Sequence, residues 1–272
     1  MKFIISVIIL CSSWVFVSSS EGIEKPIVVL IASYNNEIWC AQNLNSVFDQ
    51  EYTNYRVIYI DDCSTDNTLK RVKELVEYKN QQNKFTLIEN KKQKKAMRNF
   101  YTSIHKLTEN NEIIVILDGD DWFYDNQALQ IINKAYSSDE VWLTHGSLIE
   151  WPTSNVGWSV PIPEEIVDKN TFRKFRCPSH TRTFYSWLFK MIKKADLYYE
   201  GDFCDVTCDM AQMFPLIEMA GDRHAFISDI TYVYNTATPN SDNKLYKKRQ
   251  REVDEYLRAK SPYRRLKDKN IK

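Results

Sequence analysis

Long apolar runs in the first half of the chain alternate with segments in which apolar residues recur at helical spacing. An unbroken apolar run is typical of a strand buried on both faces, as in the middle of a parallel sheet. We therefore expect strands at 27–33, 57–60, 85–89 and 113–117, with helices near 39–48, 69–76 and 96–107. This alternation predicts an α/β fold with a single, mostly parallel, Rossmann-like sheet and flanking helices.

The pattern changes after residue 125 and predicts a mixed second half. Residues 151–185 carry four prolines and are expected to be irregular. Helices are expected near 129–135, 184–192 and 205–220, and strands at 141–143, 147–149, 224–227 and 231–234. Pro215 should kink the helix at 205–220 or divide it.

Polar side chains follow the predicted strands at the point where each strand ends. Right-handed crossovers place the carboxyl ends of parallel strands on one rim of the sheet, where open α/β sheets bind their ligands. We therefore expect six of these residues to gather there: Asn35, Asp61, Asp62, Asp118, Asp120 and Asp121.

Three carboxylates within four positions, Asp118, Asp120 and Asp121, repel one another unless a cation or another partner offsets their charge. Hard oxygen ligands suit Mg²⁺ or Mn²⁺ holding a diphosphate. The segment therefore indicates a divalent-metal site, and the alternative is an exposed acidic turn.

Composition narrows the class of protein. The chain has 272 residues, which is the size of one domain or of one domain with a small appendage. Its 36 basic and 36 acidic residues balance, so no overall field favours nucleic acid as a partner. No G-x-G-x-x-G or G-x-x-x-x-G-K-[ST] motif occurs, which argues against dinucleotide-binding and P-loop proteins.

Residues 1–20 have the features of a cleaved signal peptide: Lys2, an interrupted apolar stretch and three serines at 18–20. An uncleaved anchor is the alternative. No other window approaches 18 apolar residues, so we expect a mature chain without a transmembrane span. These features predict the secretory pathway, with a lumenal, periplasmic or extracellular location.

Five cysteines remain after Cys11 leaves with the signal peptide, and an odd number makes no complete disulfide framework. Cys177, Cys204 and Cys208 could be zinc ligands, but the chain lacks paired C-x-x-C spacing. Buried thiols or a single disulfide are favoured.

The C-terminal residues 244–272 contain twelve Lys or Arg and four Asp or Glu. A solvated helix and tail is the simplest interpretation, and contact with an anionic membrane surface or with substrate is the alternative. We divide the chain into a signal peptide at 1–20, a domain at 25–237 and a basic helix and tail at 238–272.

Several of these segments resemble the family-two glycosyltransferases with the GT-A fold. Residues 31–35 are similar to the family's first-strand motif, and 60–68 to V-D-D-G-S-T-D-G-T, with Cys63 and Asn67 replacing glycines. Residues 96–99 resemble the A-x-R-N element, 117–121 the D-x-D-D metal motif, and 232–235 the closing segment. Cys208-Asp209 stands where many members carry Glu-Asp. The resemblance covers about residues 25–237.

The resemblance implies a nucleotide-sugar donor. Its implied donor-binding residues are Ser33, Tyr34, Asn35, Asp61, Asp62, Arg98 and Asp118. Asp62 would lie near the base, Asp61 or Asp118 toward the nucleoside, and Arg98 near the nucleotide. Asp120 would bind the metal, with Asp121 assisting the metal or the sugar.

The closing segment of the family often supplies a metal-binding His, which residues 234–237 lack. His180, His224 or water could take its place.

Glycosyl transfer also needs a base that removes the proton of the acceptor hydroxyl. Asp209 is our prediction for this base, Asp202 and Asp205 are competitors, and a helix-capping role is the alternative. We thus predict a metal-dependent, inverting hexosyltransferase that uses a UDP-linked donor and Mn²⁺ or Mg²⁺, with a glycan, protein or lipid acceptor. A nucleotidyltransferase and a secreted, non-catalytic carbohydrate-binding protein of the same fold are the alternatives.

Overall fold

The computed structural model describes residues 23–238 and 245–269. The predicted signal peptide and the last residues of the basic tail lie outside the described residues. Within them, every helix is too short or too polar to cross a bilayer.

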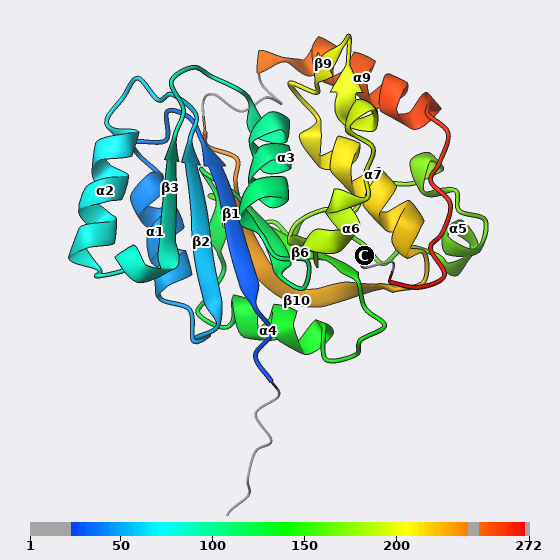
Figure 1. Ribbon diagram of the computed structural model, residues 1–272, viewed down its shortest axis with the longest axis horizontal. Helices are drawn as coiled ribbons and strands as arrows, with labels where there is room; N and C mark the ends of the chain where they lie inside the picture. The colour runs from blue at the N-terminus through cyan, green and yellow to red at the C-terminus, as the bar shows by residue number, and fades with distance from the viewer. Residues whose placement is uncertain (1–22, 239–244, 270–272) are drawn as a thin grey trace, which may run out of the picture.

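An eight-stranded sheet in the order β3-β2-β1-β4-β7-β6-β10-β5 forms the centre of the fold (Figure 1). Its first four strands are parallel, β7 is antiparallel to both neighbours, and β5 is antiparallel to β10. The strands are β1 Ile27–Ser33, β2 Tyr55–Asp61, β3 Phe85–Glu89, β4 Ile113–Asp118, β5 Trp122–Phe123, β6 Leu143–Trp151, β7 Arg182–Tyr185 and β10 His224–Asn235. This arrangement confirms the predicted GT-A-type architecture, with a parallel first half and a mixed second half.

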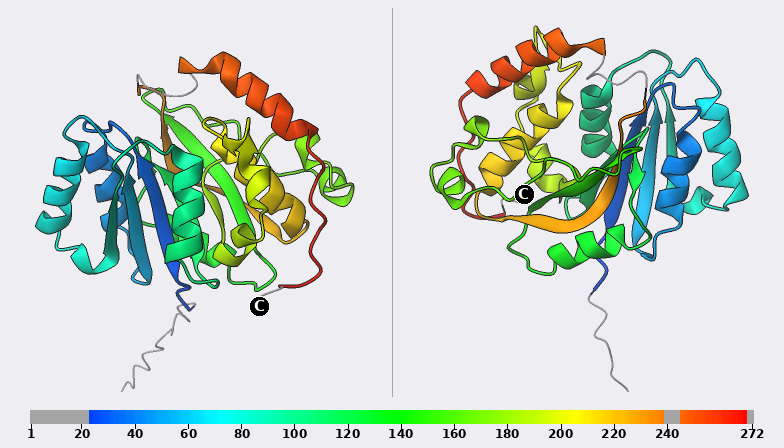
Figure 2. Two further views of the ribbon diagram at one scale, coloured as in Figure 1. Left: turned by 45° about the horizontal axis from the view of Figure 1, so that its top comes forward. Right: turned by 180° about the vertical axis from the view of Figure 1, so that it is seen from behind.

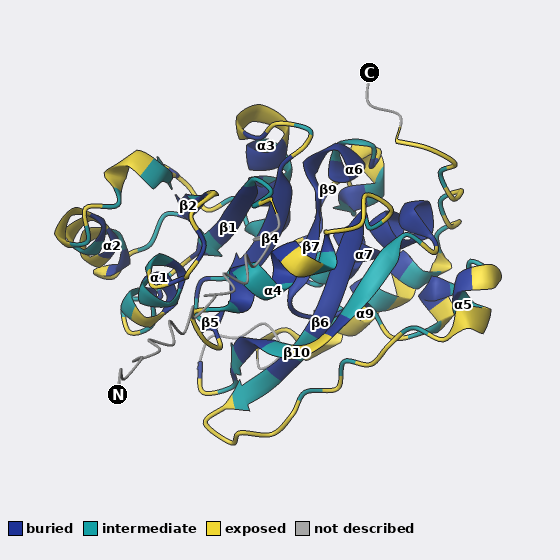
Figure 3. Ribbon diagram, turned by 90° about the horizontal axis from the view of Figure 1, so that it is seen from below, coloured by how far each residue is buried: buried dark blue, intermediate teal, exposed yellow. Residues whose placement is uncertain are grey.

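Helices cover both faces of this sheet. They are α1 Cys40–Phe48, α2 Thr68–Tyr78, α3 Ala96–Leu107, α4 Ala128–Ala135, α5 Glu164–Asp168, α6 Ser186–Lys190, α7 Cys208–Ala220 and α9 Lys247–Ala259. Helix α3 packs on β1 and contacts α6, which contacts α7. Seen from behind, β10 curves across the sheet above α4 (Figure 2). The central strands are buried and the outer helix faces are exposed (Figure 3), as apolar runs between two helical layers require.

The second half differs from the sequence prediction in four places. The segments at 141–143 and 147–149 belong largely to one strand, β6, and those at 224–227 and 231–234 form one strand, β10, with register shifts near Ile230. The helix predicted at 184–192 is wrong at its start, because Phe184 pairs with β4 and β6 in strand β7. Helix α7 is a single element that contains Pro215.

A short hairpin of β8 Tyr198–Tyr199 and β9 Asp202–Phe203 precedes α7. Helix α9 packs against α7 and buries Val253 and Leu257, so the basic C-terminal segment is attached to the domain. The five described cysteines are free thiols, and Cys40 and Cys204 are buried.

Candidate active site

A cavity of about 290 Å³ lies at the carboxyl ends of β1 and β4. Six of the residues predicted for the site line it: Ser33, Tyr34, Asp62, Asp118, Asp120 and Asp121. Asn36, Gln93, Asn99 and Tyr234 line it as well, although the sequence did not single them out as site residues. The convergence of strand-end loops on one rim is therefore what the structure shows.

Gly119 allows the acidic turn to approach the first strand closely. A Cβ atom at this position would lie 2.7 Å from Ser33 Cβ and 2.8 Å from Asn36 Nδ2. Such contacts would displace the turn, so the missing side chain lets Asp118 and Asp120 share one cavity with Ser33.

Asn43 of α1 holds the same turn through two hydrogen bonds to its backbone. Its Nδ2 donates to the carbonyl oxygens of Asp118, at 3.0 Å, and of Asp121, at 2.7 Å. The side chain is fully buried. Sequence analysis missed this residue, because a lone Asn within a helical pattern carries no local signal of such a contact.

Strand β10 holds Asp121 through two further hydrogen bonds. The Tyr232 hydroxyl donates to Asp121 Oδ2 at 2.7 Å, and the Asn235 N–H donates to Oδ1 at 2.7 Å. Asn235 Nδ2 also donates to the carbonyl oxygen of Asp120. Burial, together with the neighbouring carboxylates of Asp120 and Asp118, raises the pKa of Asp121 well above its usual range. Both oxygens of Asp121 thus serve to anchor the turn.

Two side chains from the segment at 180–182 contact Asp118. Arg182 Nη2 donates to Asp118 Oδ2 at 2.7 Å, and His180 Nε2 lies 3.2 Å from the same oxygen. Burial would raise the pKa of Asp118, but the charge of Arg182 and the contact with His180 outweigh it and hold this pKa well below its usual range. Burial and the neighbouring Arg182 lower the pKa of His180. Asp118 is therefore a stably ionised carboxylate.

The residues at this turn fit a divalent metal. One donor atom each from Asp118, Asp121 and His180 lie within 4.8 Å of one another, and Asp120 lines the same cavity. Carboxylate oxygen and imidazole nitrogen are ligands that Mn²⁺ accepts. Of the two histidines considered above, His180 is the one in this cluster. His224 instead donates from Nδ1 to the Gly221 carbonyl oxygen and stacks on His145.

The second-strand loop is built by backbone contacts. Asp62 is buried, and its carboxylate accepts hydrogen bonds from the N–H groups of Lys94 and Lys95 and from Asn90 Nδ2. Its position on the cavity wall thereby depends on the start of α3.

Asn35 and Asp61 do not line the cavity, contrary to the expected gathering of strand-end residues. Asn35 Oδ1 accepts from the N–H of Thr65, and Asp61 Oδ2 accepts from the N–H of Ser64. The Asn35 bond joins the first loop to the second, whereas the Asp61 bond lies within the second loop.

Arg98 also lies outside this cavity and lines a neighbouring one, where it forms an ion pair with Asp202. The sequence spacing could not reveal that pairing, because the two residues are more than a hundred positions apart.

Asp209 stands in the first turn of α7, and the cap position belongs to Thr207. Asp209 is half-buried, and with Asp118 it raises the pKa of Arg182 against the opposing effect of burial. The competitor Asp205 lines the cavity itself, and Asp202 pairs with Arg98. The structure therefore places Asp209 near the buried Arg182 rather than directly on the cavity wall.

The sequence profile of glycosyl transferase family 2 matches residues 28–199, more than half of the chain. The chain belongs to this family. The match confirms the resemblance, and with it the predicted enzyme class, glycosyltransferase, at the level of the family. No relative is found among the curated proteins.

Solved structures share the fold of this family-2 chain. TarS of S. aureus in complex with UDP-GlcNAc superposes with a TM-score of 0.60 at 17% identity, over 81% of this chain and 61% of that chain. The mannosyltransferase PcManGT from Pyrobaculum calidifontis, in complex with GDP-Man and Mn²⁺, superposes with a TM-score of 0.56 at 17% identity, over 89% and 67%. The chain thus spans about three fifths of the length of the TarS chain.

Proposed function

We propose that this chain transfers a sugar from a nucleotide-diphosphate donor, UDP-linked, to an acceptor hydroxyl with inversion at the anomeric carbon, and that it requires a divalent cation. The observation that carries the proposal is the cavity at the ends of β1 and β4, where Asp118 and Asp120 face Ser33 and Asp62 in a family-2 chain. The comparison structures with UDP-GlcNAc and with GDP-Man and Mn²⁺ support a nucleotide-sugar donor and a metal.

Asp120 and Asp118 would hold the cation, with His180 or water completing its ligands. When bound, the cation offsets the negative charge that the diphosphate gains as the glycosidic bond breaks. Asp121 keeps the turn in place through Tyr232 and Asn235, and it also belongs to the cluster with Asp118 and His180 that could hold the ion.

The acceptor hydroxyl must lose its proton as it attacks the anomeric carbon, and we assign this proton to the carboxylate of Asp209. Inversion requires a base on the face of the sugar opposite the leaving group, and a residue of α7, far along the chain from the metal turn, is compatible with that requirement. The charges of Asp118 and Asp209 both raise the pKa of the buried Arg182 guanidinium, so this cation interacts with both carboxylates. It would keep the Asp118 carboxylate ionised and hold it through the hydrogen bond to Oδ2.

The first twenty residues support a location in the secretory pathway, which we propose for the mature chain. N-terminal sequencing of the protein recovered from that compartment tests it: a start near residue 21 is expected, and retention of residues 1–20 contradicts cleavage.

The test of function is release of nucleoside diphosphate by the purified chain from a panel of UDP-, GDP- and TDP-sugars, with Mn²⁺, Mg²⁺ or EDTA. We expect metal-dependent release from a UDP-sugar, because such enzymes hydrolyse donor slowly without acceptor. Release of pyrophosphate from a nucleoside triphosphate and a sugar phosphate would instead identify a nucleotidyltransferase. Binding of glycan without release or donor binding would identify a carbohydrate-binding protein.

A further inference from the structure

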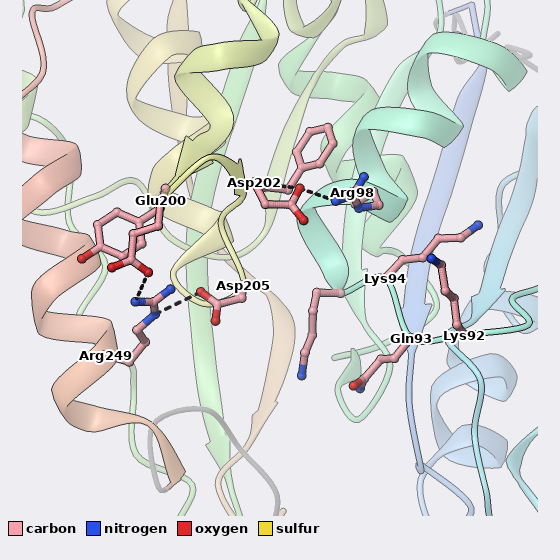
Figure 4. A pocket seen from close by; sticks show the side chains of 11 residues that line it. Lys92, Gln93, Lys94, Arg98, Glu200, Asp202, Asp205 and Arg249 are labelled. Atoms are coloured by element: carbon pink, nitrogen blue, oxygen red, sulfur yellow. Dashed lines mark hydrogen bonds and ion pairs between the residues drawn. The ribbon is translucent and has the colours of Figure 1, made fainter.

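A second cavity, of about 540 Å³, lies beside the donor cavity. Gln93, Lys95 and Asp205 line both cavities. The second cavity is bounded on one side by the start of α3, and on the other by the β8–β9 hairpin and α9 (Figure 4). A group bound here would therefore lie next to the donor.

Two guanidinium groups face this cavity from different elements, Arg98 from α3 and Arg249 from α9 (Figure 4). Arg98 Cζ lies 4.9 Å from the centre of the Phe203 ring, and Arg249 Cζ lies 4.5 Å from the centre of the Tyr199 ring. Both rings belong to the β8–β9 hairpin. Each guanidinium plane is thus held against an aromatic face.

Carboxylates hold one side of each guanidinium. Asp202 pairs with Arg98 Nη2, while Glu200 and Asp205 pair with Nη1 and Nε of Arg249, at 2.8 and 3.4 Å. No described residue accepts a hydrogen bond from Arg98 Nη1 or Arg249 Nη2. A guanidinium has five N–H donors in a planar fork, so both groups keep donors for an oxyanion.

The cavity carries an excess of positive charge. Lys92, Lys94 and Lys95 line it together with the two arginines, against the three carboxylates named above, which leaves two positive charges in excess. No carboxylate of the described residues lies within 4.0 Å of these three ammonium groups. The donor cavity has the opposite character, with five aspartates and one lysine in its lining.

We propose that this second cavity binds a phosphate group of the acceptor. The inference rests on the proposed function, since it names the chemical class of the second substrate. A phosphate monoester carries about −1.5 to −2 charges at neutral pH, which matches the excess charge of the lining. The donor diphosphate is assigned to the metal turn in the other cavity, and an acceptor must enter beside the donor sugar.

The test is calorimetric titration of the full chain with glucose 6-phosphate, using glucose as the neutral counterpart. UDP and Mg²⁺ are kept saturating, so that the donor cavity is filled. Glucose 6-phosphate should bind about tenfold more tightly than glucose. R249Q should abolish most of this preference, and K92Q, on an exposed lysine, should reduce it without loss of stability. The matched control is K248Q, which removes a neighbouring cation of α9 that is 93% exposed.

Two results overturn the inference. One is equal binding of glucose and glucose 6-phosphate by the wild-type chain. The other is a phosphate preference that appears only when UDP is left out, because competition with UDP would assign the cavity to the donor diphosphate. Nucleoside-diphosphate release is measured separately on the same protein preparations, with a UDP-sugar in place of UDP. Absence of release beside intact phosphate binding contradicts the proposed function alone, and release without a phosphate preference contradicts this inference alone.

Discussion

Arg182 Nη2 lies 2.7 Å from Asp118 Oδ2, and this ion pair joins strand β7 to the first carboxylate of the acidic turn. The two strands involved are neighbours, because Arg182 pairs in register with Ile116 of β4. The guanidinium is almost fully buried, and the charge of Asp209 acts on it as well. One internal cation thus connects the donor side of the site with the proposed base.

Replacing this cation should destabilise the fold. R182Q leaves Asp118 without its strongest partner, and we expect the free energy of unfolding to fall by about 2 kcal/mol. The loss stays moderate because the Asp118 side chain is 35% exposed and water can solvate it in part. Urea denaturation measures the change. The control R176Q, on an exposed arginine, should stay within about 0.5 kcal/mol of the wild type, and equal stability of both variants would contradict the role of Arg182.

The Tyr232 hydroxyl serves the same turn from β10. It donates to Asp121 and accepts from the N–H of Asp118. Y232F leaves a buried carboxylate oxygen without its partner, so we expect a loss of about 1–3 kcal/mol and weaker binding of UDP with metal. Y124F, on a half-exposed tyrosine next to the turn, is the comparison. Unfolding curves and UDP titrations that match between the two variants would show that the hydroxyl has no such role.

The metal-binding role of Asp120 is open to direct measurement. D120N should lower the affinity for Mn²⁺, because the ion loses an anionic oxygen ligand. Electron paramagnetic resonance of free and bound Mn²⁺ gives this affinity without reference to activity. D125N removes a charge four positions from Asp121, on a carboxylate that accepts a hydrogen bond from the Gln127 N–H, and should bind Mn²⁺ as the wild type does. Unchanged Mn²⁺ binding in D120N would move the site to Asp118, Asp121 and His180.

The sequence predicted the buried parallel strands well, because an uninterrupted apolar run such as 113–117 is a local pattern. Once these strands are placed side by side, their carboxyl ends converge on one rim of the sheet. It failed where partners are distant along the chain. Phe184 looked helical, yet it pairs with β4 and β6. The role of Arg98 as a nucleotide contact stays a prediction, but its ion pair with Asp202 was not foreseen, because Asp202 comes from a hairpin whose position no periodicity reveals. Asn43 gave no signal, since its role arises only when α1 packs beneath the acidic turn.

The buried His145 predicts a specific dependence of stability on pH. Neither ring nitrogen has a partner among the described residues, and burial, aided by His224, lowers the pKa of His145 to about 3. The unfolded pKa is about 6.5, so below that pH the unfolded state binds a proton that the folded state does not. Stability is therefore full above pH 6.5 and falls on acidification.

The expected loss from His145 alone is about 1.4 kcal/mol between pH 7.5 and 5.5. H145L should lack this component, so the difference between the two pH profiles isolates it. Chemical denaturation at both pH values measures the profiles. F226L, which alters a ring 5.2 Å from His145 without removing a titrating group, should keep the wild-type slope. Parallel profiles for H145L and the wild type would contradict the assignment.

Substitutions of Asp209 and Asp205 distinguish the two candidates for the catalytic base. D209N keeps the shape of the side chain but cannot accept the proton, so we expect kcat to fall by about 10²–10⁴ while UDP-sugar binding stays. The second variant, D205N, removes the carboxylate that lines the donor cavity and bonds Arg249. We expect D205N to raise the acceptor KM rather than to lower kcat, because Asp205 holds one wall of the phosphate cavity. Calorimetry measures the donor affinity, and steady-state kinetics measure kcat and the acceptor KM. Normal kcat in D209N with a loss in D205N would transfer the base to Asp205, which then would act from the cavity wall itself.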